Sequence, residues 1–373
     1  MKVRVVHLSS VHLWNDVRIL VRECSTLARA GYETYYVSAG APPISEAHGV
    51  RLEGITTERS RIKRMLLTQL RLYRRVRALR ADIYHFHDPE LIFAGILLQR
   101  RGAKVVYDVH ENLPHQVLTK EWLPPRSRPV VARGAEWVEQ KAARYMNAIV
   151  AATPAIARRF PAAKVVVVQN FPLRDELIQG ASVPYAQRDY AVGYVGGLTS
   201  IRGAREIVQA IALVQSVHTP VLEVAGTFYP QSLQQELETT GGWRRVRYHG
   251  LLSRTQVAEL LGRVRAGIVT LHPVPNYIEA QPIKLFEYLS AGIPVIASDF
   301  PLWRQLIGEP PCGLFVNPLD PAAIANAIDW IFTHPTEAEQ MGRYGRAMVE
   351  ERYNWDAEAE KLLALYERLA GLP

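Results

Sequence analysis

The sequence predicts an α/β fold of two doubly wound domains, each built on a parallel sheet with helices on both faces. The chain has 373 residues, which is more than one hydrophobic core usually supports. Short β-branched runs alternate with longer helical patterns, and this alternation stops and starts again near the middle of the chain. The composition, 48% hydrophobic and 21% charged, is that of a globular protein.

The β-branched runs place the strands of the two sheets. In the first half, a helix is expected over 17–30, and Gly31 ends it because glycine tolerates positive φ. The strands expected in this half are Val3–Leu8, Glu33–Val37, Ile83–His87, Lys104–Val109, Ala148–Ala151 and Val165–Val168. Those expected in the second half are Tyr190–Val195, Val221–Ala225, Arg247–His249, Ala266–Thr270 and Pro294–Ala297. Ligands of such sheets bind beyond the carboxyl ends of the strands.

A break in the pattern divides the chain. Pro172, Gly180 and Pro184 interrupt any periodicity and place a linker at about 170–185. We therefore expect a first domain over 1–172 and a second over 173–350. A helix within 351–373 is expected to pack back on the first domain.

Charge is distributed unequally between the two halves. Residues 1–170 hold 27 Lys and Arg against 14 Asp and Glu, whereas the rest of the chain holds 17 against 22. A basic first half indicates an anionic partner, such as lipid head groups, a phosphorylated acceptor or nucleic acid.

The basic charge is densest in residues 59–80, which contain nine Lys or Arg and no acidic residue. Apolar residues in this segment are spaced for one helical face, at Ile62, Leu66, Leu70, Tyr73 and Val76. Such a helix lies on an anionic membrane or packs its apolar side on its own domain, and the sequence leaves both open. Because Tyr73 is the only aromatic residue in the segment, we expect no nucleic-acid partner.

Cysteine content and hydropathy bear on the compartment. Cys24 and Cys312 are far apart in the chain, which predicts neither a disulfide framework nor a cysteine metal site. The longest apolar runs are the length of a strand, and the N-terminus lacks the apolar core of a signal peptide. We expect a cytoplasmic protein, and the basic segment 59–80 leaves open whether it also contacts the inner face of a membrane peripherally.

The segment from Tyr277 to Ser298 carries the most informative motif. Glu279 and Glu287 are separated by seven residues, and Pro282 is placed to start a helix between them. Glu279 is therefore expected on a loop and Glu287 within the helix. The free N–H groups of the helix N-terminus suit a diphosphate, and Lys284 adds a full charge there. An amphipathic helix with exposed acids is the alternative.

A second motif follows a predicted strand in the second half. Gly196 and Gly197 let the backbone approach a phosphate, and Arg202 offers a planar, permanently charged group to the same phosphate. A simple turn also accounts for the two glycines.

The predicted strand ends of the first half carry further polar residues. His110 follows the strand over 104–109. His85-Phe-His-Asp88 ends another strand, but its spacing offers no metal set without carboxylate or cysteine partners, so we interpret it as cleft lining. Near the start of the first expected helix, Asn15 or Asp16 can cap the exposed N–H groups.

Together these segments resemble the retaining family 4 glycosyltransferases of the GT-B architecture, in the subgroup that reads P-x-K-L-x-E-Y. The resemblance is strong over about 190–320 and covers nearly the whole chain. It implies two Rossmann-like domains facing across a cleft, with the nucleotide-sugar donor on the second domain and the acceptor on the first. It also implies transfer to a glycan or lipid-linked acceptor in surface polysaccharide synthesis. No cofactor or metal is implied.

The resemblance assigns roles by position. Glu279 contacts the transferred sugar, Glu287 binds the ribose, and His110 lies on the sugar side. Arg18 is a candidate for a phosphate of donor or acceptor, beside Asn15 and Asp16 on the acceptor side. Residues assigned to the donor are Gly196, Gly197, Arg202, Pro282, Ile283, Lys284, Leu285 and Glu287.

One departure from the family pattern stands out. The family often carries an arginine where this chain has Gly197, and we expect Lys284 to replace that cation. Two other functions stay open: a nucleotide-sugar epimerase of similar architecture, and a non-catalytic module that binds nucleotide sugar or a partner transferase.

Overall fold

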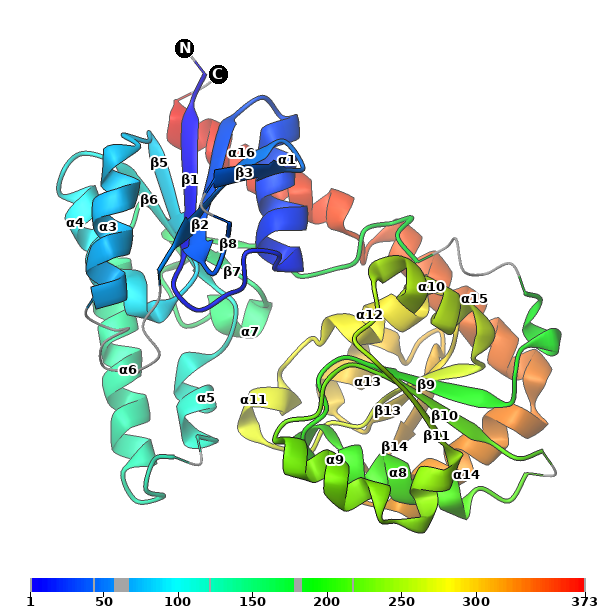
Figure 1. The fold of residues 1–373 in the computed structure, drawn as a ribbon. Coiled ribbons are helices and arrows are strands. Elements are labelled where there is room, and N and C mark those ends of the chain that lie inside the picture. Colours follow the sequence, from blue (N-terminus) through cyan, green and yellow to red (C-terminus); the bar gives the residue numbers. More distant parts are fainter. Residues whose placement is uncertain are drawn as a thin grey trace. The chain divides into compact units, whose positions relative to one another are not determined.

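The structure is a computed structural model that describes residues 2–42, 44–56, 67–120, 122–177, 183–216 and 218–371. The chain forms two compact units (Figure 1). The first unit comprises Met1–Asn170 together with Trp355–Pro373, and the second unit comprises Phe171–Asn354. Gly180, predicted to lie in the linker, falls outside the described residues.

The sheet of the first unit has the strand order β3-β4-β2-β1-β5-β6-β7-β8. All neighbouring strands are parallel except β3 and β4, which pair antiparallel at one edge. The strands are β1 (Arg4–Ser9), β2 (Glu33–Ala39), β3 (Ile44–Ala47), β4 (Val50–Ile55), β5 (Ile83–Phe86), β6 (Lys104–Val109), β7 (Ala148–Ala151) and β8 (Val165–Val167). The sequence does not predict β3 and β4, which are joined by a turn at His48 and Gly49 with positive φ.

Helices cover both faces of this sheet. The helix predicted over 17–30 is present as a π-helix, η1 (Val17–Cys24), that continues into α1 (Ser25–Arg29). The other helical elements are α3 (Gln69–Ala78), η3 (Pro89–Leu91), α4 (Ile92–Gln99), α5 (Leu113–Leu118), α6 (Arg128–Ala143), α7 (Pro154–Ala157), η4 (Ala162–Lys164) and α16 (Trp355–Ala370). The C-terminal helix α16 lies in the first unit, where the indole N–H of Trp355 donates to Thr26 Oγ1 at 3.0 Å.

Part of the basic segment 59–80 is described. Residues 57–66 lie outside the described residues, so Ile62 and Leu66 are not placed. In α3, Leu72 and Val76 are fully buried in the apolar core of the first unit, whereas Leu70 is exposed. The described part of this helix therefore packs its apolar side on its own domain. None of the helices in the described ranges combines the length and apolarity needed to cross a membrane.

The sheet of the second unit is entirely parallel, with the order β11-β10-β9-β12-β13-β14. The strands are β9 (Ala191–Val195), β10 (Val221–Ala225), β11 (Val246–Gly250), β12 (Ala266–Val269), β13 (Val295–Ser298) and β14 (Gly313–Val316). All but β14 are predicted by the sequence. The helical elements are η5 (Tyr185–Gln187), η6 (Ser200–Arg202), α8 (Ala204–Leu213), α9 (Gln231–Glu238), η7 (Gly241–Arg245), α10 (Arg254–Arg263), α11 (Pro275–Ile278), α12 (Ile283–Ser290), α13 (Pro301–Ile307), α14 (Pro321–Thr333) and α15 (Pro335–Glu351).

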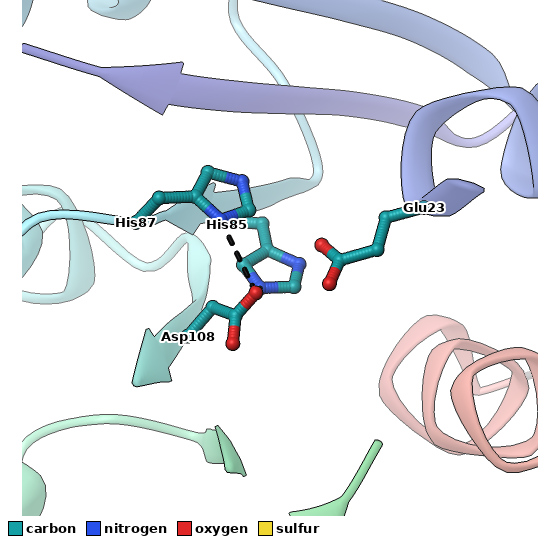
Figure 2. Close-up of side chains that lie close together, drawn as sticks. All are labelled: Glu23, His85, His87 and Asp108. Carbon is teal, nitrogen blue, oxygen red and sulfur yellow. Dashed lines mark hydrogen bonds and ion pairs between the residues drawn. The ribbon is translucent and has the colours of Figure 1, made fainter. Parts of the chain in front are cut away.

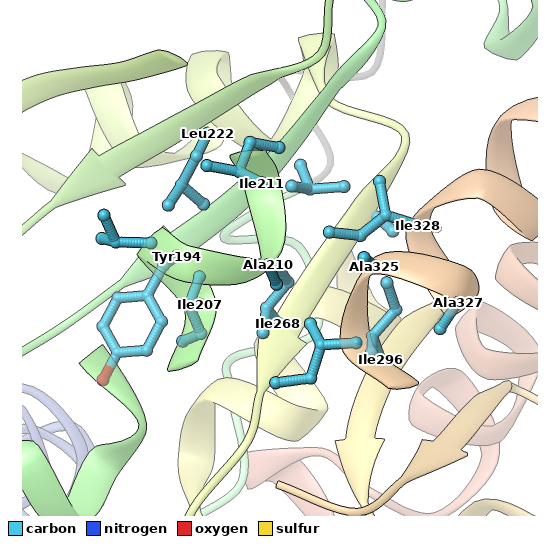
Figure 3. Close-up of a cluster of buried hydrophobic side chains, with 14 of the residues drawn as sticks. Tyr194, Ile207, Ala210, Ile211, Leu222, Ile268, Ile296, Ala325, Ala327 and Ile328 are labelled. Carbon is cyan, nitrogen blue, oxygen red and sulfur yellow. The ribbon is translucent and has the colours of Figure 1, made fainter. Parts of the chain in front are cut away.

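Apolar layers cover both faces of the second sheet. On one face, α8 and α14 pack against the strands through the side chains that Figure 3 labels: Tyr194, Ile207, Ala210, Ile211, Leu222, Ile268, Ile296, Ala325, Ala327 and Ile328. On the other face, α10 and α12 bury a second cluster that includes Leu260, Leu285 and Leu289. Burial on both faces explains why these strands are nearly continuous apolar runs.

The position of α12 on the sheet depends on a glycine. A Cβ on Gly267 of β12 would lie 2.2 Å from a ring carbon of Tyr288, so only glycine lets this ring pack on the strand. The Tyr288 hydroxyl accepts the backbone N–H of Val195, at the end of β9, at 2.9 Å. Tyr288 therefore fixes α12 against two adjacent strands.

We predict that Gly267→Ala lowers the free energy of unfolding by about 3 kcal/mol, because the added methyl group overlaps the buried ring. The matched control is Gly241→Ala, since a Cβ at that exposed glycine meets no atom within 4 Å. Urea unfolding followed by circular dichroism measures both variants. Equal losses in the two variants would contradict the proposed packing.

Candidate active site

In the second unit, a buried lysine lies beside the glycine turn that follows β9. Lys284 is in the first turn of α12, and the residue is only 8% exposed. Its Nζ lies 3.9 Å from the centre of the Tyr194 ring. Gly196 has φ +121°, and a Cβ there would come within 3.3 Å of Nζ. Glycine at this position therefore leaves room for the ammonium group under the turn.

The ammonium group of Lys284 has no hydrogen-bond partner within the described residues. Burial, followed by repulsion from Arg202, lowers the pKa of Lys284 to about 7, although Glu287 attracts the charge. A buried cation without a hydrogen-bond acceptor is costly, so this position favours an anionic ligand that restores the charge.

Arg202 is held on the other side of the same turn. Its Nη1 donates to the carbonyl oxygen of Gly197 at 3.2 Å, and its Nε donates to the Tyr277 hydroxyl at 3.3 Å. Gly203, with φ +78°, ends η6 where a Cβ would lie 2.3 Å from the carbonyl oxygen of Thr270. The structure thus brings Arg202 and Lys284 together around the glycine pair.

Two tyrosines complete this cluster, and the sequence motifs do not single them out. The Tyr194 hydroxyl donates to the carbonyl oxygen of Gly197 at 2.9 Å, and Tyr277 receives the bond from Arg202. Their positions, at the end of a strand before two glycines and just before Glu279, are the only sequence signals that could have indicated them.

The two glutamates occupy different environments. Glu279 is exposed at the C-terminal end of α11, on the loop before α12, and Glu287 lies within α12. This division agrees with the predicted loop and helix. Glu287, however, is buried and forms an ion pair with Arg254, from Oε1 to Nη1 at 2.8 Å. Arg254 also pairs with Glu176 at 2.6 Å. Glu287 is therefore not one of the exposed acids of the alternative interpretation, an amphipathic surface helix.

The N-terminus of α12 offers fewer free donors than the predicted set. Pro282 is the N-cap and has no N–H group. The N–H of Leu285 already donates to the carbonyl oxygen of Pro282 at 3.0 Å, and its side chain is fully buried. Leu285 therefore packs the helix, which leaves the backbone of Ile283 and Lys284 as the part of this turn that can meet a ligand.

In the first unit, His110 follows β6 at the edge of a buried polar network. Its Nε2 lies 2.9 Å from Asp108 Oδ2 and 3.1 Å from His87 Nδ1, and its side chain is 14% exposed. Burial would raise the pKa of Asp108, but the charges of Arg18 and His110 hold it well below its ordinary value. Asp108 is therefore ionised, and its carboxylate orients the imidazole of His110.

Arg18 does not occupy the role that the family resemblance implies. It is 4% exposed, and its Nη2 and Nη1 donate to Asp108 Oδ1 at 3.0 Å and to the carbonyl oxygen of Val168 at 2.9 Å. Its Nε also lies 3.0 Å from Glu23 Oε1. The expectation that Arg18 binds a phosphate is therefore corrected: Arg18 is an internal counter-ion, placed by contacts far apart in the sequence.

Asn15 and Asp16, the other two residues expected on the acceptor side, lie at the N-terminal end of η1. The Asp16 carboxylate caps η1 by accepting the N–H of Ile19 at 3.0 Å, as the capping interpretation predicts, and Asn15 is exposed.

His85 and His87 are not cleft lining, because they are 0% and 2% exposed. That interpretation was wrong because the strand end is covered by η1 and α16, which the local sequence does not show.

Comparison with known proteins gives matches over most of the chain. Residues 17–171 match the family described as Glycosyltransferase Family 4, and residues 175–348 match the family described as Glycosyl transferases group 1. The D-rhamnosyltransferase WbpZ of Pseudomonas aeruginosa is 23% identical over 94% of this chain and 92% of its own length. A D-inositol 3-phosphate glycosyltransferase of Corynebacterium urealyticum is 27% identical over 49% of this chain and only 44% of its own length.

A solved structure shows the same fold. HepE from Anabaena, in complex with UDP, has a TM-score of 0.72 to this chain at 16% identity, and the match covers 100% of both chains.

We predict that Lys284→Met stabilises the ligand-free protein, with a gain in the free energy of unfolding of about 2 kcal/mol at pH 6 and less at pH 9. The folded pKa of about 7 lies below the ordinary value of 10.5. Between these values the unfolded chain binds more protons, so wild-type stability rises with pH, and the buried charge costs most below pH 7. Denaturant unfolding at both pH values measures the difference.

The control for this variant is Lys141→Met, an exposed lysine on α6, which should change stability equally little at both pH values. A loss of stability in Lys284→Met at pH 6 would contradict the cost assigned to the buried ammonium group.

Proposed function

The chain belongs to the group 1, family 4 glycosyltransferases, which use nucleotide-sugar donors, and we propose that it transfers a sugar with retention to a glycan or lipid-linked acceptor. One observation supports the proposed placement of the donor. The side chains of Arg202 and Lys284 lie together at the glycine turn, and Lys284 lacks a hydrogen-bond partner within the described residues. A diphosphate supplies the two negative groups that this arrangement favours.

The proposed mechanism rests on stabilising the negative charge of the leaving group. As the bond between the sugar and the nucleotide breaks, negative charge develops on the departing diphosphate. Arg202, Lys284 and the N-terminus of α12 stabilise that charge. Lys284 takes the place of the arginine that the family often carries at the position of Gly197. Because protein cations supply this charge, the proposal assigns no metal ion to the diphosphate.

The remaining groups position the sugar and the ribose. Glu279, exposed before α12, contacts the transferred sugar, and His110, oriented by Asp108, contacts the same sugar. Glu287 accepts a ribose hydroxyl while Arg254 holds the carboxylate in place. The glutamates position the donor, and the acceptor hydroxyl attacks on the face that the nucleotide leaves.

We propose UDP as the nucleotide of the donor, because HepE, which shares this fold over its full length, is known in complex with UDP. A thermal-shift comparison of UDP, GDP, ADP and dTDP tests the base directly, since only a ligand of the native state raises the melting temperature. The largest shift is expected for UDP.

The setting is proposed to be surface polysaccharide synthesis on the cytoplasmic side of a membrane. Two features support it: the likeness to a rhamnosyltransferase over 94% of the chain, and the basic first half, which suits an anionic or lipid-linked acceptor.

We predict that UDP binding at pH 8 is coupled to the uptake of up to about one proton, because the diphosphate restores the charge of Lys284. Lys284→Met should abolish the uptake and weaken UDP binding by about 10- to 100-fold, as expected for a charge-assisted hydrogen bond. Calorimetry in two buffers with different ionisation enthalpies measures both quantities. Lys141→Met is the control, and undiminished proton uptake in Lys284→Met would exclude this role for the lysine.

We predict that Glu279→Ala lowers turnover by at least about 100-fold while UDP still binds, because the lost contact is to the sugar and not to the nucleotide. Glu337→Ala, an acidic residue in the first turn of α15, is the control. Nuclear magnetic resonance of the product should show the anomeric configuration of the donor.

The same assay separates the rival functions. A nucleotide-sugar epimerase changes the donor without an acceptor, and a binding module shows no turnover in the wild type. Full activity in Glu279→Ala would remove the proposed role of this residue.

A further inference from the structure

Four side chains of kinds that can bind a metal ion lie close together inside the first unit. They are separate from the proposed diphosphate site around Arg202 and Lys284 in the second unit. They are Glu23 of η1, His85 of β5, His87 just after β5, and Asp108 of β6. One ligand atom of each lies within 4.8 Å of the others, and all four residues are buried (Figure 2). Asp88, which directly follows the His-x-His pair in the sequence, is not part of the cluster, and both of its carboxylates come from elsewhere in the chain.

Two members of this cluster have unsatisfied polar atoms. Neither oxygen of Glu23 accepts a hydrogen bond within the described residues, although Oε1 forms an ion pair with Arg18 Nε at 3.0 Å. His85 Nε2 also has no hydrogen-bond partner there. Buried polar atoms without partners are costly, so each requires an explanation in terms of a proton, a water molecule or an ion.

Each of the four side chains is held from outside by a second group. His85 Nδ1 lies 2.7 Å from the Tyr366 hydroxyl, and His87 Nε2 lies 2.9 Å from His7 Nδ1. Arg18 contacts Asp108 Oδ1 and Glu23 Oε1, each at 3.0 Å. Metal ligands are commonly held in this way, with one atom bonded to a neighbouring group and the other directed at the ion.

The second set of ligand atoms lies close together, although Asp108 Oδ2 also contacts Arg18 Nε and His110 Nε2, and His87 Nδ1 also contacts His110 Nε2. His87 Nδ1 lies 3.2 Å and His85 Nε2 lies 3.8 Å from Asp108 Oδ2. Zinc–ligand bonds of about 2.0 Å in a tetrahedron separate the ligand atoms by about 3.3 Å. The two separations from Asp108 Oδ2 lie on either side of this value, and all four ligand atoms lie within 4.8 Å of one another.

The hydrogen bonds also allow the protonation that a metal requires. If His85 Nδ1–H donates to Tyr366 and His87 Nε2–H donates to His7, both remaining ring nitrogens carry lone pairs. These lone pairs then face Asp108 Oδ2, and a cation between them removes the repulsion; for His87 alone, the Nε2–H of His110 at 3.1 Å is a competing partner. The rival is a metal-free network in which Glu23 carries a proton.

We propose that Glu23, His85, His87 and Asp108 bind one divalent transition-metal ion of the zinc type. Two imidazoles and two carboxylates suit this class of ion, and four protein ligands in a buried site are typical of a structural site. The ion joins η1 to β5 and β6. Through Asp108 it fixes the group that orients His110, so the site is a structural support and not part of the transfer chemistry.

The test is metal analysis of tag-free protein, independent of transferase activity. After dialysis against Zn²⁺ and removal of excess ion, elemental analysis should find about one zinc per chain. Replacement by Co²⁺ should give the intense visible absorption of a four-coordinate site. A chelator should lower the melting temperature of the wild type.

Glu23→Gln and His85→Gln are the test variants, and His218→Gln, an exposed histidine of the second unit, is the control. The two test variants should lose the ion and the cobalt spectrum, whereas the control keeps both. Far-ultraviolet circular dichroism checks that each variant folds, and the metal content of the wild type decides the question even if one does not.

Wild-type protein that retains no zinc and gives no cobalt spectrum would overturn the proposal and leave the metal-free network. Stoichiometric metal in Glu23→Gln and His85→Gln would overturn it as well, because the ion would then lie elsewhere.

Discussion

The placement of one ammonium group under the glycine turn is the constraint on which the proposed donor site depends. Lys284 enters from the first turn of α12, so the position of its charge is set by how that helix lies on the sheet. Gly267 admits the ring of Tyr288, whose hydroxyl ties the helix to the end of β9. Gly196 then leaves space for Nζ, and the cost of burying the cation is offset when an anion binds.

In the first unit, a buried arginine paired with two carboxylates connects several elements of the fold. Arg18 is buried between Asp108 and Glu23 and binds the carbonyl oxygen of Val168, so it joins η1, β6 and the segment after β8. The carboxylate of Asp108 in turn orients His110. The C-terminal helix α16 contributes Tyr366 to this layer, which explains why a segment remote in sequence belongs to the same unit.

Much of this architecture follows from local patterns, and the exceptions have physical reasons. The fully buried strands β5, β7, β12 and β13 were predicted, whereas β3, β4 and β14, which were not, contain exposed or partly exposed residues. The spacing of Glu279 and Glu287 around Pro282 predicts the loop and the helix correctly. The pairing of Glu287 with Arg254 could not be read from that spacing, because α10 and α12 meet only in the folded unit. Likewise, nothing local to His85 and His87 indicates that Asp108 and Glu23 surround them.

The most direct test of the central claim is a crystal structure of the protein with UDP bound. Lys284 Nζ and an Arg202 nitrogen should each lie within about 3 Å of diphosphate oxygens, with the phosphates against the turn at Gly196. A diphosphate bound elsewhere, with the lysine still lacking an acceptor, would contradict the account.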